Sequence, residues 1–319
     1  MKVGLIDVDA ESRGKVTFPN LPLMKLSAWH KKQGDSVEWY SPLLSGHMAR
    51  VYMARVFNDE YTRDYPYYVD ADEIIRGGSG YAITLDSDGK EHYCKEQDQS
   101  LPDEIEHIYP DYDLYGIKEE SYGFLTKGCP RGCDFCHVKD MQGRIVREHA
   151  PLSEFWRGQK NIILLDPNIT ASKKFFEHMQ ELAESKAYVD FSQGLDARLL
   201  TREKIEALNN VKWKMIHFAW DKPEEDLREC FEMISKYLHR FDRRRVSVYT
   251  LTNFGSTHEQ DLERVMFLRN LGYQPYVMIY NKETAPKITR QLQSWVNNPF
   301  RFWSTKSFDE YRPGKRKED

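Results

Sequence analysis

Three cysteines stand close together in the middle of the 319-residue chain: Cys129, Cys133 and Cys136. At the spacing C-x3-C-x2-C, one short loop can place three thiolates around a face of an iron–sulfur cube, with Gly128 and Gly132 permitting tight turns. Three protein ligands on four irons leave one iron open to another molecule. The spacing therefore predicts a [4Fe–4S] cluster with one iron that the protein does not ligate.

A structural zinc site is the main alternative for the same cysteines. Zinc takes four ligands in a tetrahedron, and His137 directly follows Cys136, which makes simultaneous ligation by both residues awkward. On this alternative the chain is a non-catalytic zinc-binding interaction module. Metal analysis separates the two possibilities.

The composition limits the classes of protein that the chain can belong to. Hydrophobic residues make up 40%, enough for a sizeable core, and the net charge of −4 argues against a general nucleic-acid binder. Arg243–Arg245 could bind nucleic acid, but three arginines before a strand are more often a solvated turn. No apolar run is long enough to span a membrane, and the N-terminal apolar stretch is too short for a signal peptide. Crowded cysteines are not a secreted disulfide framework, so we expect a cytoplasmic protein with no membrane partner.

Residues 1–120 predict a small Rossmann-like open sheet. A strand at residues 2–8 is followed by an apolar helix that ends near Gly34, by strands at 36–40 and 51–57, and by the glycine-rich segment 77–80. The acidic stretch 82–120, rich in Tyr, Asp and Pro, is interpreted as a linker over the surface.

Residues 121–290 predict six strands with helices between them. Such alternation in about 160 residues indicates a parallel sheet curled into a partial barrel. The expected strands are 122–126, 162–165, 189–193, 215–220, 246–251 and 276–280. Three helix starts are indicated: Thr201 as a cap, Thr257 with Gln260 as a capping box, and Pro223 in the first turn of the helix that buries Leu227, Phe231, Ile234 and Leu238.

Residues 291–319 form a C-terminal aromatic arm and a charged tail. The aromatic stretch from Trp295 to Trp303 is either a lid over the barrel or a packing arm, which is the default. Of the other cysteines, Cys230 is expected in the core beside Phe231, and Cys94 is expected to be incidental.

Polar residues at the ends of the predicted strands are the candidate binding residues, because ligands of parallel sheets sit there. Arg198 could grip a carboxylate in a bidentate manner or form an internal ion pair with Asp196, and Asp221 could be a helix cap. Thr252, Tyr280 and Asn281 are further strand-end candidates. The residues proposed for cofactor binding are Phe135, Asp166, Asn168, Gln193, Arg198, Thr250 and Asn253.

The loop from Thr126 to Cys136 resembles the cluster-binding signature of the radical S-adenosylmethionine (SAM) superfamily, including the aromatic Phe135 before the third cysteine. In that family this aromatic lies near the adenine of SAM. Residues 191–198 and the order of the two domains resemble the branch with an N-terminal cobalamin-binding domain. The resemblance implies an α/β protein in which a partial (β/α)6 barrel follows a small Rossmann-like domain.

The resemblance also implies cofactors and partners. The cluster would cleave SAM reductively to a 5′-deoxyadenosyl radical, with electrons from an external donor such as a flavodoxin or ferredoxin. The substrate, whether small molecule, peptide or RNA, stays open. The family often has Gly-Gly-Glu after the second strand to hold the amino group of SAM, whereas this chain has Leu165–Asn168, in which Asp166 and Asn168 can accept hydrogen bonds.

Cobalamin is a second possible cofactor, which would make the chain a cobalamin-dependent methyltransferase. Residues 41–43 and 77–78 could match nucleotide-loop positions of the cobalamin domain. The D-x-H-x-x-G segment that supplies a histidine to cobalt is absent, and His30 and His47 are expected to be surface or capping residues. A degenerate first domain is the favoured interpretation.

Overall fold

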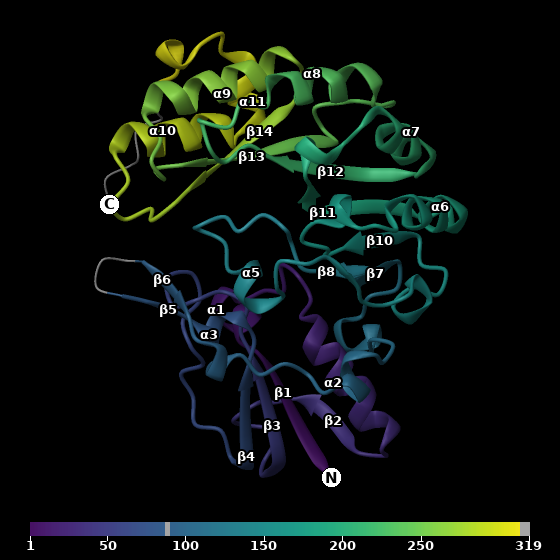
Figure 1. Ribbon diagram of the computed structural model, residues 1–319. Helices are drawn as coiled ribbons and strands as arrows, with labels where there is room; N and C mark the ends of the chain where they lie inside the picture. Colours follow the sequence, from purple (N-terminus) through teal and green to yellow (C-terminus); the bar gives the residue numbers. More distant parts are fainter. Residues whose placement is uncertain (87–89, 313–319) are drawn as a thin grey trace. The chain divides into compact units, whose positions relative to one another are not determined.

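The computed structural model describes residues 1–86 and 90–312 (Figure 1). The chain divides into two compact units, the first from Met1 to Ile162 and the second from Ile163 onward. Both units combine helices with parallel strands, which confirms the α/β class. Among the described residues, no helix has the length and apolar character that a membrane crossing needs.

The first unit is built on a four-stranded parallel sheet. Its strand order is β2-β1-β3-β4, and α2 (Leu21–Lys32) connects β1 to β2. Leu23 and Leu26 of this helix pack against Val3 and Leu5 of β1, as the apolar spacing predicts. The strands are β1 (Lys2–Asp7), β2 (Ser36–Trp39), β3 (Met48–Ala54) and β4 (Ala71–Gly77).

Strand β3 ends three residues earlier than predicted. After Ala54 the backbone N–H groups of Val56 and Phe57 donate to the carboxylate of Asp9, at 2.6 and 3.4 Å, instead of continuing a ladder. The predicted strand at 51–57 is therefore wrong in its last three residues.

The segment 82–120 is not simply a surface linker. It contains the antiparallel pair β5 (Ile83–Leu85) and β6 (Glu91–Tyr93), and Ile105 and Tyr112 are buried. The hydroxyl of Tyr112 donates to the carbonyl of Phe155 at 2.8 Å. The linker interpretation was wrong here because apolar and aromatic side chains among the acidic residues anchor the segment. The remaining short helices and strands of this unit are α1 (Val8–Arg13), α3 (Ser79–Ala82), α4 (Asp103–Glu106), α5 (Val138–Met141), β7 (Glu120–Gly123), β8 (Thr126–Lys127) and β9 (Arg147–Glu148).

A second sheet contains six strands in the order β14-β13-β12-β11-β10-β7, so its strands lie side by side in the order in which they occur along the chain, with only the separate pair β8–β9 inserted between β7 and β10. Each predicted barrel strand has a counterpart, but the first ends at Gly123 and a separate strand, β8, follows it. The later strands are β10 (Asn161–Leu164), β11 (Tyr188–Leu195), β12 (Trp213–Ala219), β13 (Val246–Thr252) and β14 (Gln274–Ile279).

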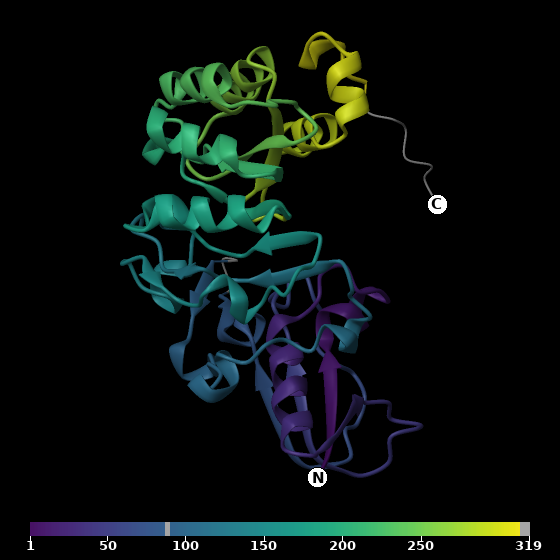
Figure 2. The same ribbon diagram turned by 90° about the vertical axis from the view of Figure 1, so that its right-hand side faces the viewer.

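Helices of the second unit cover one face of β12–β14 (Figure 2). Two predicted caps are confirmed: Thr201 caps α7, and Thr257 with Gln260 forms the capping box of α9. The buried face of α8 is also confirmed, because Leu227, Phe231, Ile234 and Leu238 are all buried. The helices are α6 (Phe175–Ser185), α7 (Arg202–Asn210), α8 (Arg228–Tyr237), α9 (His258–Asn270), α10 (Lys287–Val296) and α11 (Pro299–Ser304).

Helix α8 begins at Arg228, five residues after Pro223, so the prediction of its first turn was wrong. The indole N–H of Trp220 donates to the carbonyl of Glu225 at 2.7 Å. This hydrogen bond holds residues 221–225 as a turn, and Asp221 consequently does not cap a helix.

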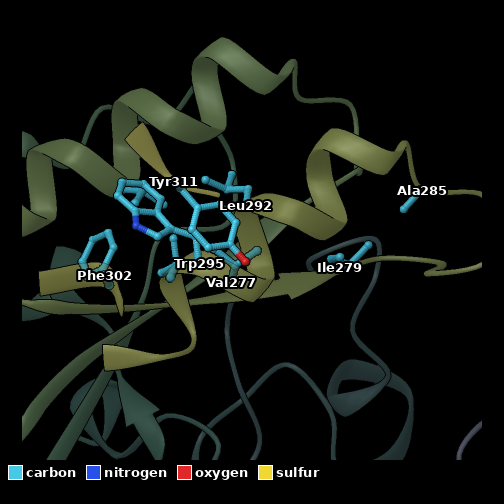
Figure 3. Close-up of a cluster of buried hydrophobic side chains, with 9 residues drawn as sticks. Val277, Ile279, Ala285, Leu292, Trp295, Phe302 and Tyr311 are labelled. Atoms are coloured by element: carbon cyan, nitrogen blue, oxygen red, sulfur yellow. The ribbon is translucent and has the colours of Figure 1, made fainter. Parts of the chain in front are cut away.

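The aromatic stretch after α10 is a packing arm. Trp295 and Phe302 are fully buried and share a core with Val277, Leu292 and Tyr311 (Figure 3). Their ring centroids lie 4.9 Å apart in a T-shaped pair. Side chains committed to this core are not available as a lid, so the default interpretation is the correct one.

Candidate functional site

The three cysteines lie on a loop whose ends are held together. Strands β8 and β9 pair antiparallel, Thr126 with Glu148 and Lys127 with Arg147, so the chain between them is closed by a two-residue ladder. Inside the loop the N–H of Cys129 donates to the carbonyl of Gly143 at 3.1 Å. The N–H of Cys136 donates to the carbonyl of Cys133 at 3.1 Å, which makes a turn between the second and third cysteines.

Two glycines shape this loop, as the sequence predicts. Gly128 and Gly132 have φ of 97° and 104°, a region that favours glycine. A β-carbon at position 128 would collide with the carbonyl oxygen of Ile145, and one at position 132 with the guanidinium of Arg144. Cys129, Cys133 and Cys136 are each partly exposed.

The loop carries three thiol side chains on one tightly turned segment of eight residues, and thiols are the donors that an iron–sulfur cluster takes. Arg144 and Lys139, whose ammonium donates to the carbonyl of Cys133 at 3.4 Å, bring positive charge to ligands that bind metals as thiolates. Within residues 1–86 and 90–312, no three His, Cys, Asp or Glu side chains are gathered closely enough to hold a metal ion. His137 lies 3.2 Å from Glu91, so its Nε2 is directed to a carboxylate.

A hollow of about 470 Å³ borders the cysteine loop within the first unit. The hairpin β5–β6 and the segment around α5 line it, and both signs of charge are present. Residues from these segments include Glu91, Tyr93, Lys95, Asp134, His137 and Lys139. The sequence did not predict that residues of this hairpin border the cysteine loop.

In the second unit, residues that follow β10 and β11 are joined by hydrogen bonds. Asp166 and Asn168 are buried, and the amide of Asn168 donates to the carboxylate of Asp196 at 3.4 Å. The N–H of Asp196 donates to the hydroxyl of Thr170 at 2.9 Å. The prediction that polar groups gather at these strand ends is met for this pair of segments.

Arg198 forms the internal ion pair that was one of its two expected roles. Its Nε donates to Asp196 at 2.6 Å, and its Nη1 contacts the carboxylate of Glu225. Burial lowers the pKa of the guanidinium, but its hydrogen bonds and charge interactions with both carboxylates together outweigh burial and raise that pKa. Phe135, the aromatic expected near adenine, is partly buried on the cysteine loop in the first unit.

Asp221 lies two residues after the end of β12, among charged neighbours. Burial raises its pKa to about 6, although Arg264 and Arg198 act in the opposite direction. Arg264 is itself buried, and its Nη2 donates to Asp261 at 2.6 Å and to the carbonyl of Leu251 at 2.9 Å. This arginine therefore ties α9 to the end of β13.

Three other predicted binding residues lie differently from expectation. Gln193 does not follow the third strand but is exposed within β11, in a bulge where residues 192–194 face only His217 of β12. Thr250 is fully buried on the face of β13 that carries Val246 and Val248, because its register partner is the core residue Val277. Asn253, with φ of 63°, donates to the carbonyl of Tyr280 at 2.8 Å and so links the ends of β13 and β14.

The sequence did not predict a row of side chains on the face of the six-stranded sheet opposite the one that carries Val246 and Val248. The rings of His217 and Tyr249 stack 5.2 Å apart with planes 5° from parallel, and Ser247 lies 3.1 Å from His217 Nδ1. Burial lowers the pKa of His217 and raises that of Tyr249 to about 12, so both are neutral at physiological pH. The sequence signal that could have found His217 and Tyr249 is their alternation with the apolar residues Ile216, Phe218 and Val248, because alternate residues of a strand face opposite sides of the sheet.

At the carboxyl ends of β1 and β3, where ligands bind in sheets of this order, the carboxylate of Asp9 accepts from Val56 N–H at 2.6 Å and from the hydroxyl of Thr62 at 2.7 Å, and so joins the segments that follow the two strands. His30 is buried, not a surface residue, with one ring nitrogen 2.7 Å from Asp35 and the other 3.0 Å from the Tyr52 hydroxyl. Both nitrogens of the exposed His47 lie beside carboxylates.

Comparison of the chain with protein-family models gives no matching family. A search of curated proteins gives no significant match.

Proposed function

We propose that the chain is a radical SAM enzyme whose Cys129, Cys133 and Cys136 hold a [4Fe–4S] cluster. The observation that carries the proposal is the C-x3-C-x2-C spacing on a glycine-shaped loop with pinned ends. Six strands that lie side by side in the order in which they occur along the chain support a partial barrel as the scaffold. When bound, the cluster supplies one electron to SAM and yields methionine and a 5′-deoxyadenosyl radical.

The chain's own residues have defined tasks in this proposal. Asp166 and Asn168 are buried, and their side-chain oxygens are of the kind that can accept hydrogen bonds from an amino group. Because Arg198 is already engaged by Asp196 and Glu225, it positions the segment after β11. An external donor such as a flavodoxin or ferredoxin delivers the electron, and Phe135 packs near the adenine.

Anaerobic reconstitution tests the proposal with controls from the chain itself. We expect about four irons per chain and 5′-deoxyadenosine from SAM under reductant. Replacing Cys129, Cys133 or Cys136 by Ser should abolish 5′-deoxyadenosine formation and lower the iron content. The matched variants Cys94→Ser and Cys230→Ser should retain both. Stoichiometric zinc in place of iron, or iron without SAM cleavage, would refute the proposal.

A further inference from the structure

Positive charge is concentrated at the edge of the second unit where β11, β12 and β13 begin. The segments 185–188, 209–214 and 238–245 contain seven basic residues and one acid, Asp242, although the whole chain has 50 acidic and 46 basic residues. Because the three strands are parallel neighbours, their first residues meet at one edge. We call these seven side chains the basic edge: Lys186, Lys212, Lys214, Arg240, Arg243, Arg244 and Arg245.

Aromatic rings hold four of these cations in place. Arg240 and Arg245 lie over the buried indole of Trp213, with guanidinium carbons 5.1 and 5.7 Å from the ring centre. Arg243 lies 4.5 Å over Trp303, and Lys212 lies 5.8 Å over Tyr188. A ring orients a cation without cancelling its charge.

Carboxylates do not neutralise the basic edge. In the part of the chain that the structure describes, none of the seven side chains makes an ion pair. Asp242 instead accepts from the backbone N–H of Arg244 at 2.8 Å and so shapes the turn before β13. The positive charges of the basic edge are therefore not cancelled by carboxylates of the described residues, although Arg240 also donates to the carbonyl of Val211 at 2.6 Å.

The exposed ring of Tyr188 indicates which kind of anion the basic edge binds. This residue opens β11, is 40% exposed, and has the ammonium of Lys212 over its ring. Surfaces that bind single-stranded nucleic acid combine cations for the phosphates with aromatic rings on which bases stack. An acidic protein would use the cations but would not need the ring.

We propose that the basic edge binds single-stranded nucleic acid, with the cations on its phosphates and Tyr188 stacked on a base. The surface lies at the opposite end of the strands from Asp196, Asp221 and Asn253. It is independent of the cysteines and of the function proposed for them.

Fluorescence anisotropy of a labelled oligouridine of about 16 nucleotides, with the full chain, tests this inference. With about four phosphates neutralised, the slope of log K against log salt should be about −3, so raising salt about fourfold should weaken binding about 50-fold. The triple variant Lys212→Glu, Lys214→Glu, Arg244→Glu should bind at least about tenfold more weakly with a smaller slope. The variant Tyr188→Ala should bind the oligouridine about 5- to 100-fold more weakly than the unchanged chain.

A charge-matched control separates the edge from net charge. Lys15, Lys173 and Lys174 are exposed and lie outside the basic edge. Their triple replacement by Glu changes the net charge equally and should leave binding within about twofold. Absence of binding at low salt, or equal weakening in this control, overturns the inference. Displacement by polyglutamate together with no effect of Tyr188→Ala also overturns it, because the surface would then suit an acidic protein.

Discussion

The carbonyl oxygen of Ile145 lies only 2.3 Å from the position that a β-carbon at Gly128, directly before the first cysteine, would take. Gly128→Ala must therefore displace backbone and also forces a side chain into φ of 97°. We expect this variant to lose most of its reconstituted iron, measured per chain, and to melt at a lower temperature.

Gly143→Ala is the matched control for that variant. Gly143 lies in the same loop and has φ of 87°, but a β-carbon there meets nothing within 4 Å. It shares the backbone strain of about 1 kcal/mol without the collision. Equal iron loss in both variants would show that strain, and not the close approach of Ile145, controls the loop.

The raised pKa of Asp221 predicts a pH-dependent stability. Its pKa is about 6 in the folded chain and near 3.8 in the unfolded chain, so the folded state holds the proton more tightly. Ionisation therefore costs stability progressively between pH 4 and 6, and the cost is complete above that range. Asp221→Asn should raise the free energy of unfolding by roughly 3 kcal/mol at pH 8 and by well under 1 kcal/mol at pH 4. Urea titrations at the two pH values measure this, and a pH-independent difference would contradict it.

The buried pair of Arg264 and Asp261 within α9 should contribute far more to stability than the exposed pair of Glu263 and Arg228, which joins α9 to α8. Arg264→Leu leaves the carboxylate of Asp261 buried and removes donors from the carbonyls of Trp220 and Leu251, which should cost about 3–5 kcal/mol. Glu263→Gln breaks the exposed pair with Arg228 and should change stability by less than about 1 kcal/mol. Denaturant unfolding of both variants checks the contrast.

Because Trp295 is a core residue, truncating its side chain should cause a large loss of stability. Trp295→Ala removes a fully buried indole from the core shown in Figure 3 and should cost about 3–5 kcal/mol. A lid residue would instead leave the melting temperature nearly unchanged, so thermal unfolding distinguishes the two roles.

Regular periodicity made much of the fold predictable. The strands from β10 to β14, the caps at Thr201 and Thr257, and the buried face of α8 follow from local apolar spacing and capping chemistry. Errors arose where a distant partner decides the local structure. Asp9 ends β3 from 47 residues away, and Tyr112 is buried by its contact with Phe155.

The candidate site was predictable only in part for the same reason. Cysteine spacing and strand-end polarity are visible in the sequence, and they located the loop and the pair Asn168–Asp196. The register of the strands cannot be read from the sequence. It is the register that makes Thr250 face the core and that keeps Gln193 inside β11 instead of after its end. The stacked pair of His217 and Tyr249 was missed because its residues come from two strands.

The bulge in β11 has a consequence for insertions and deletions. Phe191 pairs with Ile216 and Leu195 pairs with Phe218, so the bulge adds an even number of residues and both apolar side chains stay on the core face. Deleting Ser192 and Gln193 together would keep Leu195 opposite Phe218, whereas deleting either one alone would turn Leu195 outward. The bulge can therefore gain or lose two residues while the apolar side chains of β11 stay on the core face. Insertions and deletions in this strand should be tolerated there, where they change only the residues that do not face the core.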